Sequence, residues 1–486
     1  MKRTKKIKEL FAGSGESVSG AAAEISVSGV QFDSRRVQAG DLFVAVRGFK
    51  TDGHRYLPVA HEKGALAAVV EEISPEVPLP QIQVKNARRV LAYLGANFYR
   101  PEIDALTLIG ITGTNGKTTT SYLVRSVLQN AGWPCGLLGT IQYQIGSQTL
   151  AAWNTTPEAA DVAAMLFQMA RENFKACVME ISSHALALNR VDGLRFAVGV
   201  FTNLTRDHLD FHKTFEDYFA SKCHLFDLLL PDGTAVVNMD DEYGKKAIDR
   251  IRQTVLTFGQ NPLADVHPLK TRVTLQGIEM TCATPFGSID IRSALTGDFN
   301  VQNILAAVAV GLALHIPLNA IRAGIASVTH VPGRLESYEI KPGVRAVIDY
   351  AHTPDSLQKA LKALRPMTEG RLLVVFGAGG DRDRGKRPLM GQVAESLADV
   401  VFVTSDNPRN EDPQKIIDDI VQGMHDAGKR RVILDRKEAI FAAVQEARPG
   451  DVLLVAGKGH ETYQIIKGKK FDFDEVAILK EAAKRA

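Results

Sequence analysis

At 486 residues the chain is too long for one hydrophobic core, so two to four domains are expected. Its 58 Lys and Arg nearly balance 55 Asp and Glu, and the net charge of +3 argues against a protein that coats nucleic acid. The basic opening MKRTKKIKELFAG lacks the apolar stretch of a signal peptide, and no apolar run is long enough to predict a membrane span.

The cysteines indicate the compartment. They are far apart and form no CxxC pair: Cys135, Cys177, Cys223 and Cys282. Reduced thiols and a cytoplasmic location are therefore expected.

The first part of the chain, residues 1–103, is expected to form a small N-terminal α/β domain. The segments GDLFVAV, AAVVEE and PQIQVK predict short strands. The segment ARRVLAYLGANFY predicts a helix that ends at Arg100, before Pro101.

Residues 104–332 are predicted to form a central domain with a parallel sheet of the P-loop NTPase type. Apolar strands such as FKACVMEI, FAVGVFTNL and GTAVVN alternate with helical patterns. The last block, residues 333–486, repeats this alternation around RAVIDYAH, RLLVVFGAGG, DVVFVTSD and DVLLVAGKG. It predicts a Rossmann-like, doubly wound C-terminal domain whose ligands lie at the carboxyl ends of the strands.

The most informative segment is LIGITGTNGKTTT, an apolar strand followed by a glycine-rich turn and a helix. Gly113 and Gly116 would let backbone N–H groups approach phosphate oxygens, Lys117 would supply a cation, and Thr118 would offer a hydroxyl to Mg²⁺. The common P-loop has a glycine where this chain has Ile111. A glycine-rich turn with a chance lysine therefore stays the alternative.

Polar side chains follow two central strands. Glu180 ends one strand, and NLTRDHLDFH places Asp207, His208, Asp210 and His212 after the next. Carboxylates near a triphosphate suit Mg²⁺, whereas an imidazole is a less usual ligand. Taken alone, both segments are also compatible with solvated polar loops.

Three further segments carry residues with alternative interpretations. Lys222 lies in a half-apolar helical pattern, which by itself is typical of a surface lysine. Asn300 and Asn303 share a helix face and could recognise a nucleoside, although Asn300 could equally cap the helix. Arg409 follows a proline turn and, with Arg382, could grip a carboxylate, although basic loops are often only solvated.

These segments in this order resemble the Mur ligase family over essentially the whole chain. The motifs that carry the resemblance are GTNGKTTT, NTTP, EISSHAL, NLTRDHLDFH, YFASK, NVQNILAA, PGRLE, DYAHTPD, GAGGDRDRGKRPLMG, DNPR and GKGHE.

The resemblance implies an ATP- and Mg²⁺-dependent ligase in cytoplasmic peptidoglycan precursor synthesis. The carboxylate of UDP-N-acetylmuramoyl-L-alanyl-D-glutamate would attack the γ-phosphate of ATP, and the amine of an amino acid would then capture the acyl phosphate. DNPR is similar to the version of the pocket that takes meso-2,6-diaminopimelate rather than L-lysine. Partners would be small molecules, with no nucleic acid, and we expect a monomer.

The resemblance also assigns site residues. The ATP-binding set comprises Gly113, Thr114, Asn115, Gly116, Lys117, Thr118, Thr119, Asn303, Arg334 and Asp349. The metal set comprises Thr118, Glu180, His208 and Lys222, and the catalytic set comprises Lys117, Lys222 and His208. Lys222 matches the lysine that the family carbamylates. The first-domain site for the UDP moiety comprises Phe32, Ser34, Phe49, Lys50 and Thr51. Contacts to the muramoyl peptide comprise Thr155, Thr156, Ser182 and Arg190. The amino-acid pocket comprises Arg382, Asp406, Asn407, Pro408, Arg409, Gly457 and Glu461.

One position departs from the family pattern. Leu188 stands where the family often has Gln, two residues before Arg190, which weakens a specific hydrogen bond there. The alternatives are a sister ligase that adds L-lysine or another amino acid, a folylpolyglutamate synthetase, and a nucleotide-gated binding module without ligase activity.

Overall fold

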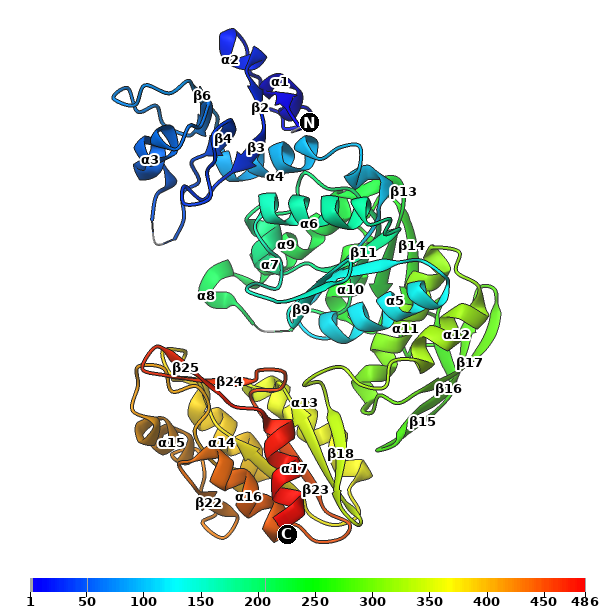
Figure 1. The fold of residues 1–486 in the computed structure, drawn as a ribbon. Coiled ribbons are helices and arrows are strands. Elements are labelled where there is room, and N and C mark those ends of the chain that lie inside the picture. The colour runs from blue at the N-terminus through cyan, green and yellow to red at the C-terminus, as the bar shows by residue number, and fades with distance from the viewer. Residues whose placement is uncertain (1–2, 50, 206, 486) are drawn as a thin grey trace. The chain divides into compact units, whose positions relative to one another are not determined.

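The computed structural model describes residues 3–49, 51–205 and 207–485, and the side chains of residues 209 and 210 also lie outside this description. The described chain is mixed α/β with three main sheets, which confirms the predicted fold class (Figure 1). No helix of the described residues is both long and apolar enough to cross a membrane.

The N-terminal part has a four-stranded parallel sheet in the order β3-β4-β5-β6. The elements of this part are β1 (Lys5–Lys6), α1 (Ile7–Leu10), α2 (Ala21–Glu24), β2 (Ser26–Val27), β3 (Gly29–Gln31), β4 (Asp41–Val44), α3 (Leu57–Glu62), β5 (Ala67–Val70), β6 (Gln81–Gln83) and α4 (Ala87–Phe98). The side chain of Asn86 caps α4 by accepting the N–H of Arg89 at 2.9 Å.

The central part has an eight-stranded sheet in the order β10-β9-β8-β11-β7-β12-β13-β14. The pairs from β8 to β14 are parallel, and the hairpin of β9 and β10 adds antiparallel strands at one edge. The strands are β7 (Thr107–Thr112), β8 (Cys135–Leu138), β9 (Gln142–Ile145), β10 (Gln148–Ala151), β11 (Ala176–Glu180), β12 (Phe196–Phe201), β13 (Leu229–Asn238) and β14 (Thr254–Phe258). The helices are α5 (Lys117–Asn130), α6 (Ala159–Arg171), α7 (Ser183–Ala187), α8 (Leu209–His212), α9 (Phe215–Asp227), α10 (Glu242–Ile248), α11 (Asp298–Ala313) and α12 (Leu318–Ala326).

The central strands are buried along nearly their whole length. Every residue of β11 is buried, as is every residue of β7 after Thr107. Consecutive buried residues face opposite sides of a sheet, so helices must cover both faces. A smaller sheet, β15-β16-β17, follows with strands at His267–Thr274, Gly277–Thr284 and Gly287–Ser293.

The C-terminal part has a six-stranded sheet in the order β18-β19-β23-β20-β21-β22, parallel except for β18. Its strands are β18 (Glu336–Lys341), β19 (Val344–Asp349), β20 (Leu372–Phe376), β21 (Val400–Val403), β22 (Arg430–Val432) and β23 (Val452–Ala456), followed by the hairpin β24 (Tyr463–Ile466) and β25 (Lys469–Asp472). Its helices are α13 (Pro354–Leu364), α14 (Lys386–Leu397), α15 (Pro413–Val421), α16 (Arg436–Glu446) and α17 (Glu475–Arg485).

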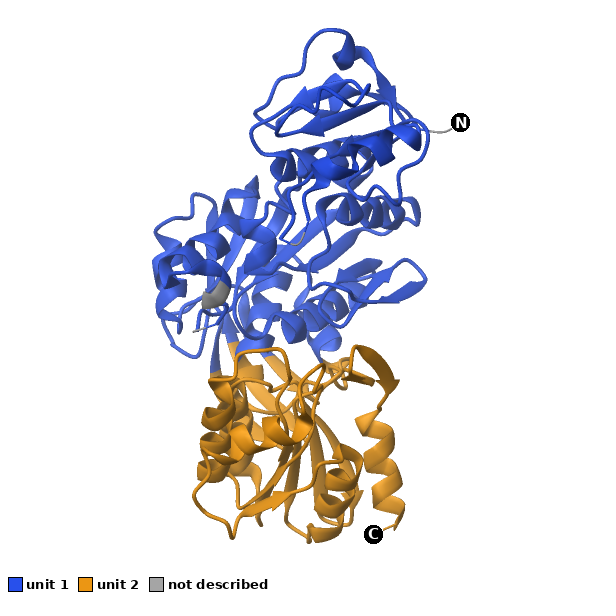
Figure 2. Ribbon diagram, turned by 90° about the vertical axis from the view of Figure 1, so that its left-hand side faces the viewer, with its two compact units in different colours: residues 1–268, 283–289, 302–325 blue, residues 269–282, 290–301, 326–486 orange. Residues whose placement is uncertain are grey.

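The chain separates into two compact units (Figure 2). Unit 1 comprises residues 1–268, 283–289 and 302–325, and unit 2 comprises residues 269–282, 290–301 and 326–486. The N-terminal and central sheets both belong to unit 1. The three predicted domains, 1–103, 104–332 and 333–486, stay a prediction at the level of their boundaries.

Candidate active site

The glycine-rich loop connects β7 to α5. Gly113 has φ 146° and Gly116 has φ 86°, a region that side chains other than glycine rarely adopt. A Cβ atom on Gly113 would lie 1.9 Å from Oγ1 of Thr202, and one on Gly116 would lie 2.4 Å from Oδ1 of Asn303. The loop therefore requires both glycines, and Asn303 lies directly against it.

Two lysines meet at this loop. Nζ of Lys117 donates to the carbonyls of Gly113 and Thr114, each at 2.9 Å, and Nζ of Lys222 donates to the same Gly113 carbonyl at 2.8 Å. Lys222 is 1% exposed, so its interpretation as a surface lysine is wrong. Burial, together with the charge of Lys117, lowers the pKa of Lys222 well below its ordinary value.

Tyr218 is a site residue that the sequence analysis missed. Its hydroxyl lies 3.1 Å from Oγ1 of Thr114, and Nζ of Lys222 lies 4.5 Å from the centre of its ring. An aromatic at this spacing in an amphipathic helix has no sequence signal that separates it from an ordinary core residue. Asn203 was also missed, and its Oδ1 accepts the backbone N–H of Asn115 at 2.9 Å.

Glu180 joins the helix α5 to the polar residues of the neighbouring loop. Its carboxylate accepts hydrogen bonds from Oγ1 of Thr118 and from both the backbone N–H and the hydroxyl of Thr140, all at 2.9 Å. Thr119 follows Thr118 in α5 and is buried. Thr118 and Glu180 thus place a hydroxyl and a carboxylate together at the start of α5, where hard oxygen ligands suit Mg²⁺.

His208 belongs to a different group of side chains. Its ring centre lies 4.9 Å from that of His184 and 6.2 Å from that of Tyr218, and its side chain is 47% exposed. Burial and the neighbouring His184 lower the pKa of His212 to about 4. Within the described residues, no three His, Cys, Asp or Glu side chains are grouped to hold a metal. The predicted metal set accordingly depends on the Thr118 hydroxyl and on Lys222.

The four predicted muramoyl-peptide residues lie next to Glu180. Oγ1 of Thr155 is 3.1 Å from Oγ1 of Thr140, and Thr156 donates to the carbonyl of Glu180 at 2.8 Å. Thr156 also accepts the N–H of Ser182 at 3.1 Å and, through its carbonyl, Nη1 of Arg190 at 2.9 Å.

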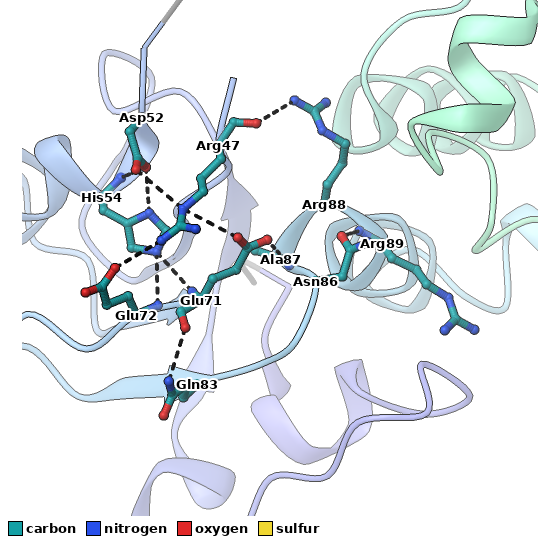
Figure 3. Close-up of polar contacts among 10 residues, drawn as sticks. All are labelled: Arg47, Asp52, His54, Glu71, Glu72, Gln83, Asn86, Ala87, Arg88 and Arg89. Atoms are coloured by element: carbon teal, nitrogen blue, oxygen red, sulfur yellow. Dashed lines mark hydrogen bonds and ion pairs between the residues drawn. The ribbon is translucent and has the colours of Figure 1, made fainter. Parts of the chain in front are cut away.

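The predicted first-domain residues are distributed over two loops. Ser34 is buried, and Phe32 packs against the N-terminal core. The second loop comprises the described residues 47–49 and 51–52, and we refer to it as the 47–52 loop; Lys50 lies outside the described residues. Figure 3 shows Arg47 and Asp52, at the two ends of this loop, beside the polar residues that contact them. Phe49 lies 6.0 Å from the ring of Phe211, and Thr51 contacts the hydroxyl of Tyr56 at 3.1 Å.

In unit 2 the DNPR segment follows β21 and is held by its own side chains. Oδ1 of Asn407 accepts Nζ of Lys458 at 3.0 Å, and Nδ2 donates to Glu461 at 2.8 Å. Pro408 is buried, and Arg409 has φ 52° and donates from Nη1 to the carbonyl of Gly380 at 2.8 Å. This contact brings Arg409 to the loop that carries Arg382.

A group of buried charges supports this segment. Burial would raise the pKa of Asp406, but Lys458 at 3.7 Å and the charge of Arg436 outweigh it, so the pKa of Asp406 is lowered. Gly457 has φ 120°, and a Cβ there would lie 2.4 Å from Oδ2 of Asp406. Arg436 is fully buried and pairs with Glu475 at 2.7 Å. The sequence analysis missed three of these charged residues. Arg436 and Glu475 lie far from DNPR in the sequence, and Lys458 follows Gly457, which was one of the residues assigned in that segment.

The remaining predicted nucleotide residues of unit 2 lie together. The guanidinium of Arg334 lies 5.0 Å from the ring centre of Tyr350, and the N–H of Leu335 donates to Asp349 at 2.9 Å. Burial raises the pKa of Asp349, and the charge of Arg334 partly offsets it. Arg334, Asp349 and Tyr350 thus lie close together in unit 2.

Comparison with known proteins gives the same family for each part of the chain. The model "Mur ligase family, catalytic domain" matches residues 26–99, "Mur ligase middle domain" matches 111–311, and "Mur ligase, glutamate ligase domain" matches 333–459. The UDP-N-acetylmuramoyl-L-alanyl-D-glutamate--2,6-diaminopimelate ligase of Geobacter metallireducens is 45% identical over 483 residues, which is 94% of each chain. The ligase of the same name from Gloeobacter violaceus is 45% identical over 462 residues, again 94% of each chain. A solved structure of a protein with this name is 33% identical, covers 99% of each chain and has a TM-score of 0.73. The chain therefore belongs to the Mur ligase family.

Proposed function

We propose that this chain is an ATP-dependent ligase that adds meso-2,6-diaminopimelate to UDP-N-acetylmuramoyl-L-alanyl-D-glutamate in peptidoglycan precursor synthesis. The observation that carries the proposal is the convergence of Lys117 and Lys222 on one carbonyl of the glycine-rich loop, beside the Thr118–Glu180 pair. The names of relatives 40–45% identical over most of the chain support the substrate assignment.

In the first step two anions must approach each other. A carboxylate oxygen of the dipeptide attacks the γ-phosphorus of ATP, the bond to the β,γ-bridging oxygen breaks, and ADP leaves with that electron pair. The Lys117 ammonium donates to two carbonyls of the loop. When ATP is bound, this ammonium would neutralise charge on the phosphates. The N–H groups at the start of α5 would provide fixed donors for the phosphates, whereas those of Thr114 and Asn115 donate to Asn203.

In the second step the amine of diaminopimelate attacks the acyl carbon. The carbon–oxygen bond to phosphate breaks, inorganic phosphate leaves, and the nitrogen loses a proton as the amide forms. When one site holds both reactants, the reaction between them becomes effectively unimolecular. We expect this positioning to be the main contribution of the binding residues.

Mg²⁺ fits the Thr118–Glu180 pair, because a hydroxyl and a buried carboxylate 2.9 Å apart are oxygen ligands of the kind it prefers. When bound there, Mg²⁺ would neutralise charge on the phosphate oxygens. His208 would be a further ligand only if its half-exposed ring turned toward this pair.

Lys222 is suited to carbamylation. Only a neutral amine can bond to the carbon of CO₂ and release a proton, and the buried surroundings of Lys222 favour the neutral amine. The resulting anion would have a cationic neighbour in Lys117 and a place beside the metal pair. We also place the protein in the cytoplasm, in keeping with four free, buried cysteines, and keep the monomer as an expectation.

Selectivity for diaminopimelate follows from its second carboxylate. Arg409 and Arg382 offer it a guanidinium partner, whereas L-lysine would leave the arginines without one. A substrate panel tests the proposal: ATP, the UDP-linked dipeptide and either amino acid are mixed with the purified chain, and product and ADP are quantified. We expect equal amounts of product and ADP with diaminopimelate, and at least about tenfold slower turnover with L-lysine. Equal turnover of both amino acids would overturn the selectivity, and ADP release without product would favour a binding module or ATPase.

A further inference from the structure

Glu158 lies between two arginines of unit 1 instead of capping its own helix. It occupies the N-cap position of α6, where an acidic side chain ordinarily accepts N–H groups of the first turn, yet it makes no such bond. Its carboxylate accepts Nη1 of Arg88 at 3.0 and 3.2 Å and pairs with Nη2 of Arg190 at 2.8 Å. The three side chains are only 14–21% exposed, so solvent weakens these pairs less than it weakens a surface pair.

The Arg88 side of this group reaches the 47–52 loop. Nη2 of Arg88 donates to the carbonyl of Arg47 at 3.2 Å (Figure 3). The Arg47 guanidinium in turn pairs with Glu72 at 3.0 Å and with Asp52 at 3.5 Å, so the base of the loop is closed. These contacts connect the predicted UDP-binding loop to Glu158.

The Arg190 side reaches the predicted peptide contacts. Nη1 of Arg190 donates to the carbonyl of Thr156, whose hydroxyl donates to the carbonyl of Glu180 and accepts the N–H of Ser182. An unbroken series of contacts thus extends from the 47–52 loop through Glu158 to Ser182.

We propose that Glu158 is a positioning residue that, through Arg88 and Arg190, fixes the separation between the UDP end and the peptide end of the nucleotide-substrate site. The inference rests on the proposed function, in which one long molecule contacts both ends. A site whose two ends are already aligned loses less conformational entropy when such a molecule binds. Affinity for the whole molecule should then depend on Glu158, whereas affinity for one end alone should not.

Glu158→Gln removes the charge and leaves the size nearly unchanged, so that the two guanidiniums face each other without an anion between them. Arg88→Met removes the connection to the loop from the other side. Arg89→Met is the matched control, because Arg89 is the next residue of α4 and pairs with Asp192 at 3.7 Å instead of Glu158. Figure 3 shows Arg88 and Arg89 leaving the helix in different directions.

The measurement is titration calorimetry of the full chain with UDP-N-acetylmuramoyl-L-alanyl-D-glutamate and, separately, with UDP alone. In Glu158→Gln and Arg88→Met we expect the Kd of the full nucleotide to rise at least about tenfold and that of UDP to change less than about twofold. The variant that combines Glu158→Gln and Arg88→Met should bind the full nucleotide about as tightly as the single variant with the lower affinity, because both substitutions break the same connection. Arg89→Met should bind both ligands like the unchanged chain, and Arg88→Lys should lose less affinity than Arg88→Met.

Two results would overturn the inference while leaving the ligase activity intact. Equal losses for UDP and for the full nucleotide would show that Glu158 merely supports the fold of the loop, and unchanged affinity for both would show that the connection has no role. If the unchanged chain did not bind the full nucleotide at all, the proposed function itself would be overturned, and the inference with it.

Discussion

Among the described residues two lysines are almost completely buried, one in each unit, and their surroundings differ. Lys222, 1% exposed, donates to the carbonyl of Gly113 and lies over the ring of Tyr218. Lys458, 0% exposed, lies 3.5 Å from Glu461, 3.7 Å from Asp406 and 3.0 Å from the amide oxygen of Asn407.

Equal burial therefore produces different chemistry. Near Lys222 burial and a second lysine act in the same direction and lower its pKa, so a neutral amine is available as a nucleophile. Around Lys458 two carboxylates lie within ion-pair distance, and the charge of Lys458 in turn lowers the pKa of Asp406. The first lysine is suited to react, and the second is suited to hold a binding segment in place.

The largest expected effect tests the reactive lysine. Lys222→Ala should reduce kcat by at least about 100-fold, because it removes the group proposed to carry the carbamate beside the phosphates. The measurement is the initial rate of product formation with all three substrates, together with the mass of intact wild-type protein in bicarbonate buffer. A variant with the full rate would contradict the role of Lys222.

The second prediction concerns stability and has outcomes of different size for the two lysines. Lys458→Met should lower the free energy of unfolding of the C-terminal unit by about 3 kcal/mol, because it removes the cation nearest to the buried Asp406 and the partly buried Glu461. Lys222→Met should lower it by less than about 1 kcal/mol, since it replaces an uncompensated amine with an apolar group. Urea unfolding followed by circular dichroism measures both.

Lys437→Met is the surface control for this pair. Lys437 is 48% exposed and pairs with Glu481 at 2.9 Å, so its replacement should change the free energy of unfolding by no more than about 0.5 kcal/mol. If Lys222→Met and Lys458→Met destabilised the chain equally, the contrast between their surroundings would have no energetic meaning.

The third prediction concerns the segment that Lys458 supports. Arg409→Ala should reduce kcat/KM for diaminopimelate at least about tenfold and leave the KM for ATP nearly unchanged, because only the amino acid carries the second carboxylate. Arg384→Ala is the control, since Arg384 is 73% exposed and pairs with Glu411 at 3.3 Å. A variant at Arg409 that kept full diaminopimelate activity would exclude this role.

The smallest expected effect is on the pH dependence of stability. The folded-state pKa of Lys222 lies below its ordinary value of 10.5, so between the two values the unfolded chain binds more protons and stability rises with pH. We subtract the urea midpoint of Lys222→Met from that of the wild type at each pH. This difference should increase as the pH of the measurement is raised from about 7 to about 9. A difference that stayed flat would mean that Lys222 is charged when folded.

The contribution of Asp406 to stability should change at acidic pH, whereas that of Lys222 changes at neutral to alkaline pH. Its folded-state pKa lies below the ordinary value of 3.8, so its contribution is present above that value and is lost as the pH falls through the folded-state pKa.

The local patterns were sufficient for the parallel strands β7, β11, β12 and β13 and for the glycine-rich loop, whereas the strands β9, β10 and β15 to β17 were not predicted. Strand, glycine turn and helix around Gly113 and Lys117 are consecutive in the sequence, so their order predicts their geometry. Lys222 shows where this reasoning ends. The half-apolar pattern of α9 does not tell which polar residue faces the sheet, and only the approach of the β7–α5 loop shows that Lys222 faces inward.

Long-range electrostatics was the other part that could not be predicted. Arg436 and Lys458 act on Asp406 from distant parts of the sequence, Glu475 pairs with Arg436, and Arg88 reaches Glu158 across 70 residues of sequence. No local spacing encodes such pairs. The roles of Lys222, Arg409 and Glu158 stay predictions that the experiments above address.

The most direct test of the account is to measure ADP release with and without the acceptor acid while an acyl phosphate is trapped with hydroxylamine. ADP should form only when UDP-N-acetylmuramoyl-L-alanyl-D-glutamate is present, and omission of diaminopimelate should let the trap yield the hydroxamate of that dipeptide. ADP that accumulates equally fast without the dipeptide, or a trap that never yields a hydroxamate, would contradict the claim that ATP cleavage activates this carboxylate.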